Sequence, residues 1–418
     1  MQQTARRGFI SKRIRSSQRL SREHRSLIAN SLMHLVNDGC FVAIYPILPL
    51  IALEYHLNYA QVGLLKTALT ASSTAFQIPM ALLAERFGEI AMLAMGMAWV
   101  GAGFVVLGLA ASFAQTLFLL VAAGTGGSVQ HPVASSFVSR EYEGRRRGSA
   151  LGVLNFAGDL GKFMIPLVFA LSLTAYGWRA SLVGLGAVSF VFAMAFWYLL
   201  RDKDRGSRSA VQQARATPTK GWGILQPKTF GAILSMGVLD SSVRSALLTF
   251  VPFLLIDRGL SATQASLMLT VIFAGGAAGK LGCGILADKL GTTRMIVCTE
   301  TMTGALILLL LPAGQWAMLP LLFCVGFFLN GTSSVLLDGV AELFDATKRS
   351  RGYGLYFTIY LGAGAIGPIV YGTIGDAWSL PMVFWAMAMA SLAIVPLTWL
   401  YHLSRTATIS SPSPTPMT

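Results

Sequence analysis

Long apolar stretches alternate with short clusters of charged residues along the whole chain. A helix needs about 20 apolar residues to cross a bilayer, so continuous stretches of that length indicate spanning helices. The strands of a membrane barrel would instead alternate apolar and polar positions over about ten residues. We delimit twelve apolar stretches, at residues 27–53, 59–84, 89–111, 115–139, 148–173, 179–200, 229–256, 262–287, 292–312, 315–342, 352–375 and 381–403. The pattern predicts an all-α membrane protein with twelve transmembrane helices.

The composition supports this prediction. Of the 418 residues, 54% are hydrophobic and only 12% are charged, whereas a soluble globular protein is about 25% charged. Twelve spans use roughly 240 residues, which leaves short loops and two tails. A soluble enzyme with one anchor and a large aqueous domain are therefore both excluded.

The distribution of Lys and Arg predicts the orientation in the membrane. If the N-terminus is cytoplasmic, 26 of the 32 Lys and Arg fall on the cytoplasmic side, eight of them within the first 26 residues. By the positive-inside rule, both termini are then cytoplasmic. This bias explains the net charge of +14 without nucleic acid, so we expect the lipid bilayer as the partner of these charges.

A polar segment divides the twelve spans into six and six. Residues 201–228 are mostly polar, without a hydrophobic period, and are interpreted as a cytoplasmic linker. We therefore expect a basic cytoplasmic N-tail at 1–26, a six-helix bundle at 27–200, a second bundle at 229–404 and a disordered C-tail at 405–418.

The two halves also resemble each other in sequence at an almost constant offset. Residues 83–88 match 286–291 at an offset of 203, and Asn37 falls on Asp240 at the same offset. These matches indicate duplication of a six-helix unit. Two pseudo-symmetric bundles related by an axis along the membrane normal are typical of rocker-type secondary transporters, whose substrate site lies between the halves near the midplane.

Two loop motifs carry a family resemblance. Residues 84–89 and 284–294 resemble the cytoplasmic signature of the major facilitator superfamily. Within it, residues 34–49, 124–136 and 144–166 are similar to the fosmidomycin-resistance-like group. The resemblance implies the major facilitator fold, a bacterial inner membrane, a monomer and proton-driven efflux of a small anionic or amphipathic compound.

The signature loops suggest gating residues. An acid at a helix end can pair with a base across a short loop and hold the cytoplasmic side shut, so that opening breaks the pairing. We expect gating roles for Glu85, Arg86, Asp288, Lys289, Arg147, Arg351 and Glu342.

Charged residues inside the spans are candidates for proton coupling. Such residues are costly in a bilayer and usually face the protein interior with a function. Asp38 and His34 share one helix face, and a buried carboxylate exchanges protons near neutral pH unless a cation holds it charged. We expect them to form the proton site, with Asp240 and Asp159 as further carriers; a purely structural hydrogen-bond network is the alternative.

Cationic and polar side chains in the spans are candidates for substrate binding. Arg244 offers a planar donor set suited to a carboxylate or phosphonate, and Lys162 lies in span 5, which is usually uncharged in the resembling group. The alternative is internal pairing with Asp240 and Asp159. Lys280 is expected to extend towards the cytoplasm. The remaining candidates are Asn37, His131, Gln130, Asn330, Tyr45 and Tyr360.

Other classes of chemistry find no support. Residues 362–367 spell a dinucleotide-binding glycine pattern, but inside an apolar span without a preceding strand, so close helix packing explains them better. We expect no metal, no cofactor and no enzymatic activity. The competing function is a proton symporter that imports a small carboxylate or phosphonate, and a membrane enzyme or receptor is the more distant rival.

Overall fold

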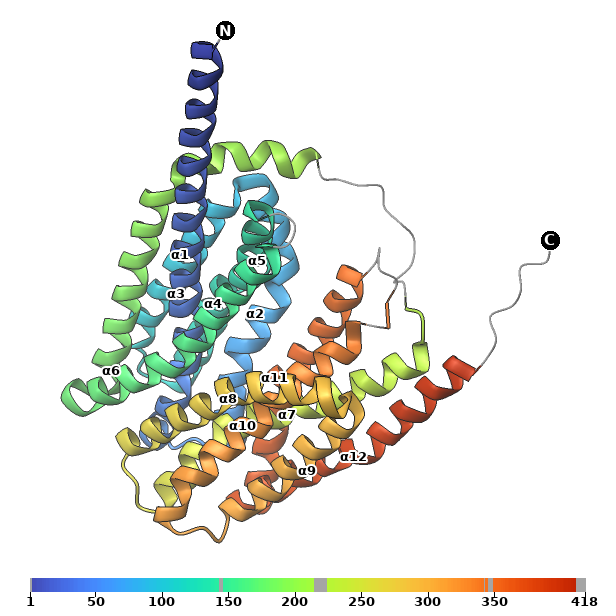
Figure 1. Ribbon diagram of the computed structural model, residues 1–418. Coiled ribbons are helices and arrows are strands. Elements are labelled where there is room, and N and C mark those ends of the chain that lie inside the picture. Colours follow the sequence, from blue (N-terminus) through green and yellow to red (C-terminus); the bar gives the residue numbers. More distant parts are fainter. Residues whose placement is uncertain (1, 143–145, 214–223, 342, 345–348, 411–418) are drawn as a thin grey trace.

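The structure is a computed structural model that describes the backbone of residues 2–142, 146–213, 224–341, 343–344 and 349–410. Side chains are described from 24 to 403, except at 85, 143–149, 202–223, 288, 337–338, 341–342 and 345–354. Within these ranges the chain is helical and forms no strand (Figure 1). The helices are α1 (Gln2–Tyr55), α2 (Tyr59–Phe87), α3 (Glu89–Leu107), α4 (Phe113–Gly127), α5 (Gln130–Glu141), α6 (Arg146–Gln213), α7 (Pro227–Asp257), α8 (Ala262–Leu290), α9 (Thr292–Leu310), α10 (Gln315–Ala341), α11 (Arg349–Ala377) and α12 (Leu380–Ser410).

These helices confirm the twelve predicted spans. The fourth span is divided into α4 and α5 by a break just before Gln130, close to Pro132. The fifth and sixth spans are joined in α6, which bends at Gly177, where φ is 74°. A left-handed φ is easy for glycine because it has no Cβ, so the chain reverses there without a loop.

Helix extends beyond the apolar stretches at several ends. α1 begins at Gln2, so the expected N-tail is helical, and α6 continues to Gln213 into the expected linker. Likewise α12 runs to Ser410. A nucleated helix propagates by one hydrogen bond for each added residue, and this does not require an apolar side chain. Hydropathy therefore finds the spans but not the helix ends.

The internal repeat is visible in local structure. α2 and α8 each open with a capping box, formed by Asn58 with Gln61 and by Ser261 with Gln264. Asn58 and Ser261 are related by the predicted offset of 203 residues. Such boxes satisfy the free N–H groups of a first turn. The shared caps show that the two halves repeat one structural unit.

The halves pack against each other through α2 with α11 and α6 with α8, near the helix ends that lie away from the chain termini (Figure 1). Thr67 Oγ1 donates to Ala365 O at 2.6 Å, and Ser266 Oγ donates to Pro166 O at 3.0 Å. Asp376 accepts from the first two N–H groups of α2, at 2.7 and 2.8 Å. A carboxylate at a helix N-terminus is favoured by the helix dipole, so these contacts close this face.

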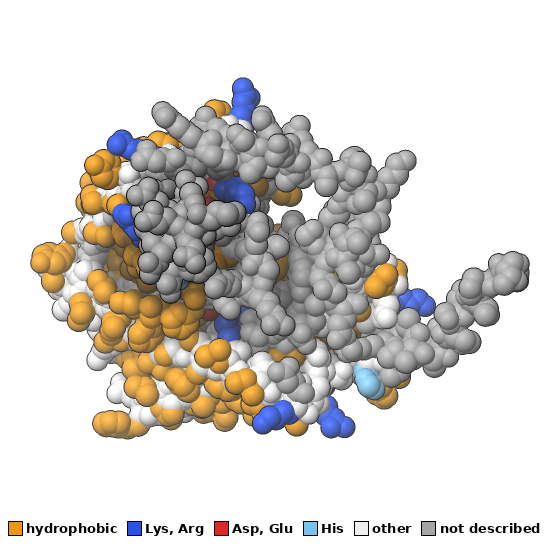
Figure 2. Space-filling view, turned by 45° about the horizontal axis from the view of Figure 1, so that its top comes forward, with side chains coloured by type: hydrophobic (Ala, Val, Ile, Leu, Met, Phe, Trp, Pro, Cys, Tyr) orange, Lys and Arg blue, Asp and Glu red, His pale blue; other side chains and the backbone are white. Residues whose placement is uncertain are grey.

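Towards the face that carries the termini, the same helices diverge (Figure 1). There α2 exposes Ile78 and Leu82, and α8 exposes Leu281. Elsewhere, large apolar side chains such as Phe118 of α4 and Trp385 of α12 are exposed on the outside. Figure 2 shows hydrophobic side chains over much of the described surface. An apolar exterior of this kind suits a lipid environment.

Candidate functional site

A cavity between the two halves gathers most of the charged residues inside the spans. Its main part has a volume of roughly 290 Å³, and an adjoining part has roughly 250 Å³. Helices α1, α2, α5 and α6 line it from the first half, and α7, α8, α10 and α11 from the second. Its polar and charged lining residues include Asp38, Tyr45, Lys66, His131, Asp159, Lys162, Arg244, Lys280, Asn330 and Tyr360.

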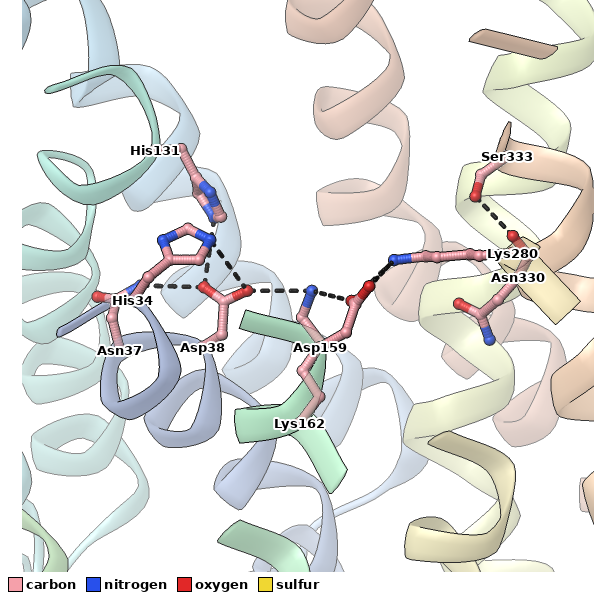
Figure 3. A network of polar contacts seen from close by, with 9 residues as sticks. All are labelled: His34, Asn37, Asp38, His131, Asp159, Lys162, Lys280, Asn330 and Ser333. Carbon is pink, nitrogen blue, oxygen red and sulfur yellow. Dashed lines mark hydrogen bonds and ion pairs between the residues drawn. The ribbon is translucent and has the colours of Figure 1, made fainter. Parts of the chain in front are cut away.

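Asp38 of α1 is the centre of the first charged cluster. Its side chain is only 3% exposed. The Lys162 Nζ atom lies 3.0 Å from Asp38 Oδ2, the His131 Nε2 atom lies 3.6 Å from Oδ1, and the His34 Nε2 atom lies 3.8 Å from Oδ2 (Figure 3). Asn37 Nδ2 donates to Oδ1 at 3.3 Å. The expected pair of Asp38 and His34 is thus in place, with a lysine from α6 as the partner of the carboxylate.

The cluster continues across the cavity into the second half. Lys162 Nζ lies 3.2 Å from Asp159 Oδ1, and Lys280 Nζ of α8 lies 2.7 Å from both oxygens of Asp159 (Figure 3). The expectation that Lys280 extends towards the cytoplasm is wrong, because a carboxylate on the facing helix holds its ammonium group. Two lysines and two aspartates thus form one ionic chain that joins α1, α6 and α8.

The same cluster contains a possible set of metal ligands. His34, Asp38 and His131 bring one ligand atom each within 4.8 Å of one another. Imidazole and carboxylate are ligands that zinc accepts. The Lys162 ammonium, however, already contacts Asp38 and repels a second cation at this carboxylate. The residues therefore fit a metal centre poorly.

Arg244 and Asp240 of α7 form the second charged cluster. The Arg244 guanidinium pairs directly with Asp240 Oδ2, and Tyr360 Oη donates to the same oxygen at 3.1 Å. Tyr360 also stacks on Tyr356, with ring centroids 5.5 Å apart. Arg244 and Tyr360 line the cavity, whereas Asp240 is fully buried behind them. The internal ion pair that the sequence offered as the alternative to substrate binding is therefore present, and Arg244 also lines the cavity.

Glu300 of α9 is a buried acid that the sequence interpretation missed. It is 1% exposed, and the side chains of Ser391 and Thr332 lie close enough to interact with its carboxyl group. It lies close enough to Asp240 and Arg244 to interact electrostatically with both. The sequence did contain a signal for Glu300, since an acid in the middle of an apolar span is by itself a functional candidate.

Several predicted residues lie at the cavity, and others do not. Asn330 and Tyr45 line it, as expected. Gln130, Asn37 and His34 are buried but lie outside the cavity lining. Asn37 reaches the site through Asp38, and His34 reaches it through Asp38 and through an edge-on contact with the His131 ring, with the centroids 5.0 Å apart.

Most of the predicted gating residues lie outside the described side chains. This applies to Glu85, Arg147, Asp288, Arg351 and Glu342. The other two, Arg86 and Lys289, are exposed at the ends of α2 and α8.

A described ion pair lies next to the first signature loop. Glu89 at the start of α3 pairs with Arg140 at the end of α5, and Ser136 Oγ donates to Glu89 Oε1 at 2.8 Å. This pair joins two helices of the same half, so it holds the half together at the face that carries the termini.

Comparisons with known proteins agree with this architecture. The model of the Major Facilitator Superfamily matches residues 31–253 and 233–417. The fosmidomycin resistance protein of Escherichia coli (strain K12) is 28% identical, covering 85% of this chain and 87% of that protein. The probable sulfoacetate transporter SauU of Cupriavidus necator is 25% identical, covering 91% and 95%.

Two solved structures share the fold. A bacterial homolog of the human lysosomal transporter Spinster, in an inward-facing and unoccupied conformation, has a TM-score of 0.73 at 18% identity and covers 94% of this chain and 99% of that chain. The peptide transporter POT has a TM-score of 0.74 at 14% identity, covering 92% and 94%.

Proposed function

Because the chain belongs to the Major Facilitator Superfamily, we propose that it is a proton-coupled secondary transporter that moves a small organic anion by alternating access. The observation that carries the proposal is the ionic chain from Asp38 to Lys280 inside the cavity between the halves. Charges at this depth are costly, and a transport pathway is their usual reason.

Alternating access is supported by the contacts between the halves. They lie at the ends of α2, α6, α8 and α11 away from the termini, and the helices diverge at the other end (Figure 1). With the termini in the cytoplasm, the molecule is open to the inside. Rocking of one half against the other would break the contacts of Thr67 and Asp376 and expose the cavity to the outside.

Proton coupling follows from competition for the two lysines. An anion that contacts Lys162 or Lys280 competes with Asp38 and Asp159 for these cations. A buried carboxylate that loses its cation favours the protonated form. Binding of an anion and binding of a proton then support each other, as thermodynamic linkage requires. This geometry supports movement of both in the same direction.

Export is the second candidate, and a different observation favours it. The family resemblance implies efflux, and the fosmidomycin resistance protein of Escherichia coli is named for resistance. Export by exchange with protons requires that the anion and the proton compete for the carrier. In that case the anion would have to bind the form in which Asp38 is deprotonated and paired with Lys162, and to leave when Asp38 takes up a proton.

Transport in proteoliposomes tests the proposal and separates the two directions. The probes are labelled sulfoacetate and fosmidomycin, under an imposed pH gradient. Accumulation inside with acid outside indicates symport, and accumulation with acid inside indicates exchange. Uptake that ignores the gradient contradicts proton coupling, and uptake of neither probe contradicts the proposed substrate class.

A further inference from the structure

Lys66 of α2 is a buried cation that the ionic chain does not use. Its side chain is 2% exposed and belongs to the lining of the cavity. Its Nζ atom lies 4.4 Å from the centroid of the Tyr45 ring. Within the described side chains it makes no hydrogen bond and no ion pair. No charged neighbour of the described chain offsets its desolvation.

The other three cations of the cavity each have a carboxylate. Lys162 contacts Asp38, Lys280 contacts Asp159, and the Arg244 guanidinium contacts Asp240. Glu300 lies on α9, outside the cavity lining. When these pairs are formed, Lys66 is the one cationic side chain of the described lining that contacts no carboxylate.

We propose that Lys66 is an anion-binding residue of the transport cavity, which holds the carboxylate, sulfonate or phosphonate group of the solute. The inference rests on the proposed function and names the group that recognises the substrate. A buried charge without a partner is unfavourable, and a cation–π contact with one tyrosine offsets only part of that cost. A ligand anion would supply the missing counter-charge.

A second unpartnered donor belongs to Arg244, which lines the same cavity from the other half. The Nε atom of Arg244 is buried and has no hydrogen-bond partner in the described part of the chain. Arg244 and Lys66 both line the main part of the cavity. An anion between α2 and α7 would therefore be held by both halves of the transporter.

Lys66 lies next to a residue that joins the two halves at the closed face. The next residue, Thr67, makes the 2.6 Å hydrogen bond to Ala365 that joins α2 to α11. An anion entering from the open side meets Lys66 at the closed end of the cavity. The negative charge of the bound anion then lies beside the hydrogen bond from Thr67 to Ala365, which must break when the halves rock.

Equilibrium binding of sulfoacetate, fosmidomycin and inorganic phosphate to the purified protein tests this proposal. Binding is followed by thermal stabilisation, because a ligand that binds only the folded state raises its melting temperature. No proton gradient is involved, so the result does not depend on proton coupling. The variants are Lys66→Gln, which removes the charge, and Lys66→Arg, which keeps it. The matched control is Lys228→Gln, at an exposed lysine at the start of α7.

Lys66→Gln is expected to weaken binding of the anion by about thirty-fold or more, because truncating one partner of a buried charge pair is costly. Lys66→Arg should retain most of the affinity, and Lys228→Gln should match the wild type. Unchanged affinity in folded Lys66→Gln overturns the proposal, as does failure of all three anions to stabilise the wild-type protein.

A measurement on the wild type covers the case in which Lys66→Gln does not fold. Crystals soaked in selenate should show an anomalous peak within about 4 Å of the Lys66 ammonium, the usual limit of an ion pair. Selenate found only at other positions overturns the assignment.

Discussion

Gly63 of α2 provides a direct test of alternating access. A Cβ atom added there would lie 2.2 Å from Pro368 O, 2.5 Å from Pro368 C and 2.7 Å from Ile369 Cα. These are backbone atoms of α11, which cannot turn aside as a side chain can. Gly63→Ala should therefore disfavour the state in which α2 and α11 touch. It should not disfavour a state in which they have separated.

The magnitude follows from the cost of overpacking. Extra atoms in a well-packed interior cost about 1 to 3 kcal/mol, which corresponds to a shift of about five-fold to about 150-fold in the equilibrium between the two states. Gly362→Ala on α11 is the matched control, since no atom lies within 4 Å of its added Cβ. It gains the same helix propensity of about 1 kcal/mol.

Spin labels at Leu109 and Trp316 provide the assay, in a background without the native cysteines. Both side chains are exposed, at 73% and 97%, in the two halves at the face away from the termini. Double electron–electron resonance should show longer distances between the two spin labels in Gly63→Ala than in Gly362→Ala. Identical distance distributions in the two variants would refute the proposed opening of this face, even if Gly63→Ala melts at a lower temperature.

Three further predictions concern the charged groups. Asp38→Asn should abolish pH-driven accumulation in proteoliposomes while exchange of labelled for unlabelled anion persists; an unaltered response to pH would remove Asp38 from the mechanism. Lys280→Gln should destabilise the protein by about 1 to 3 kcal/mol, because it leaves Asp159 with Lys162 as its one remaining described cation, and the added change Asp159→Asn should recover much of the loss; additive losses in thermal unfolding would show that the pair is not coupled. Asp376→Asn should weaken the N-terminal cap of α2 by about 1 kcal/mol and lengthen the distances between the same two spin labels, and unchanged distances would show that this cap does not hold the face closed.

The fold was predictable because it depends on local patterns. Apolar length defines the spans, and most predicted boundaries lie within a few residues of the helix ends. The bend at Gly177 joins two spans that the sequence separates, and α6 extends to Gln213 past its apolar stretch. Hydropathy does not report helix beyond the membrane, so it misplaced those ends.

The candidate site was predictable within a helix but not between helices. Asp38 and His34 are four residues apart, so helical spacing alone places them together. The contacts of Lys162 with Asp38 and of Lys280 with Asp159 join different helices, and no periodicity reports such distances. Lys280 was therefore assigned to the wrong environment.

Two further residues were missed for another reason. Lys66 lies in α2 and Glu300 in α9, both without charged neighbours in the sequence that would suggest a pair. Each is a single charge inside an apolar stretch, which is itself a functional signal. Both side chains are buried in the folded protein, at 2% and 1% exposed.

Lumenal pH in proteoliposomes tests the coupling of anion and proton most directly. A trapped dye reports the pH inside while sulfoacetate is added outside without an imposed gradient. The proposed symport predicts that the lumen acidifies as labelled sulfoacetate enters, and that Asp38→Asn removes the pH change. Entry of the label into wild-type proteoliposomes with no change of lumenal pH would contradict proton coupling.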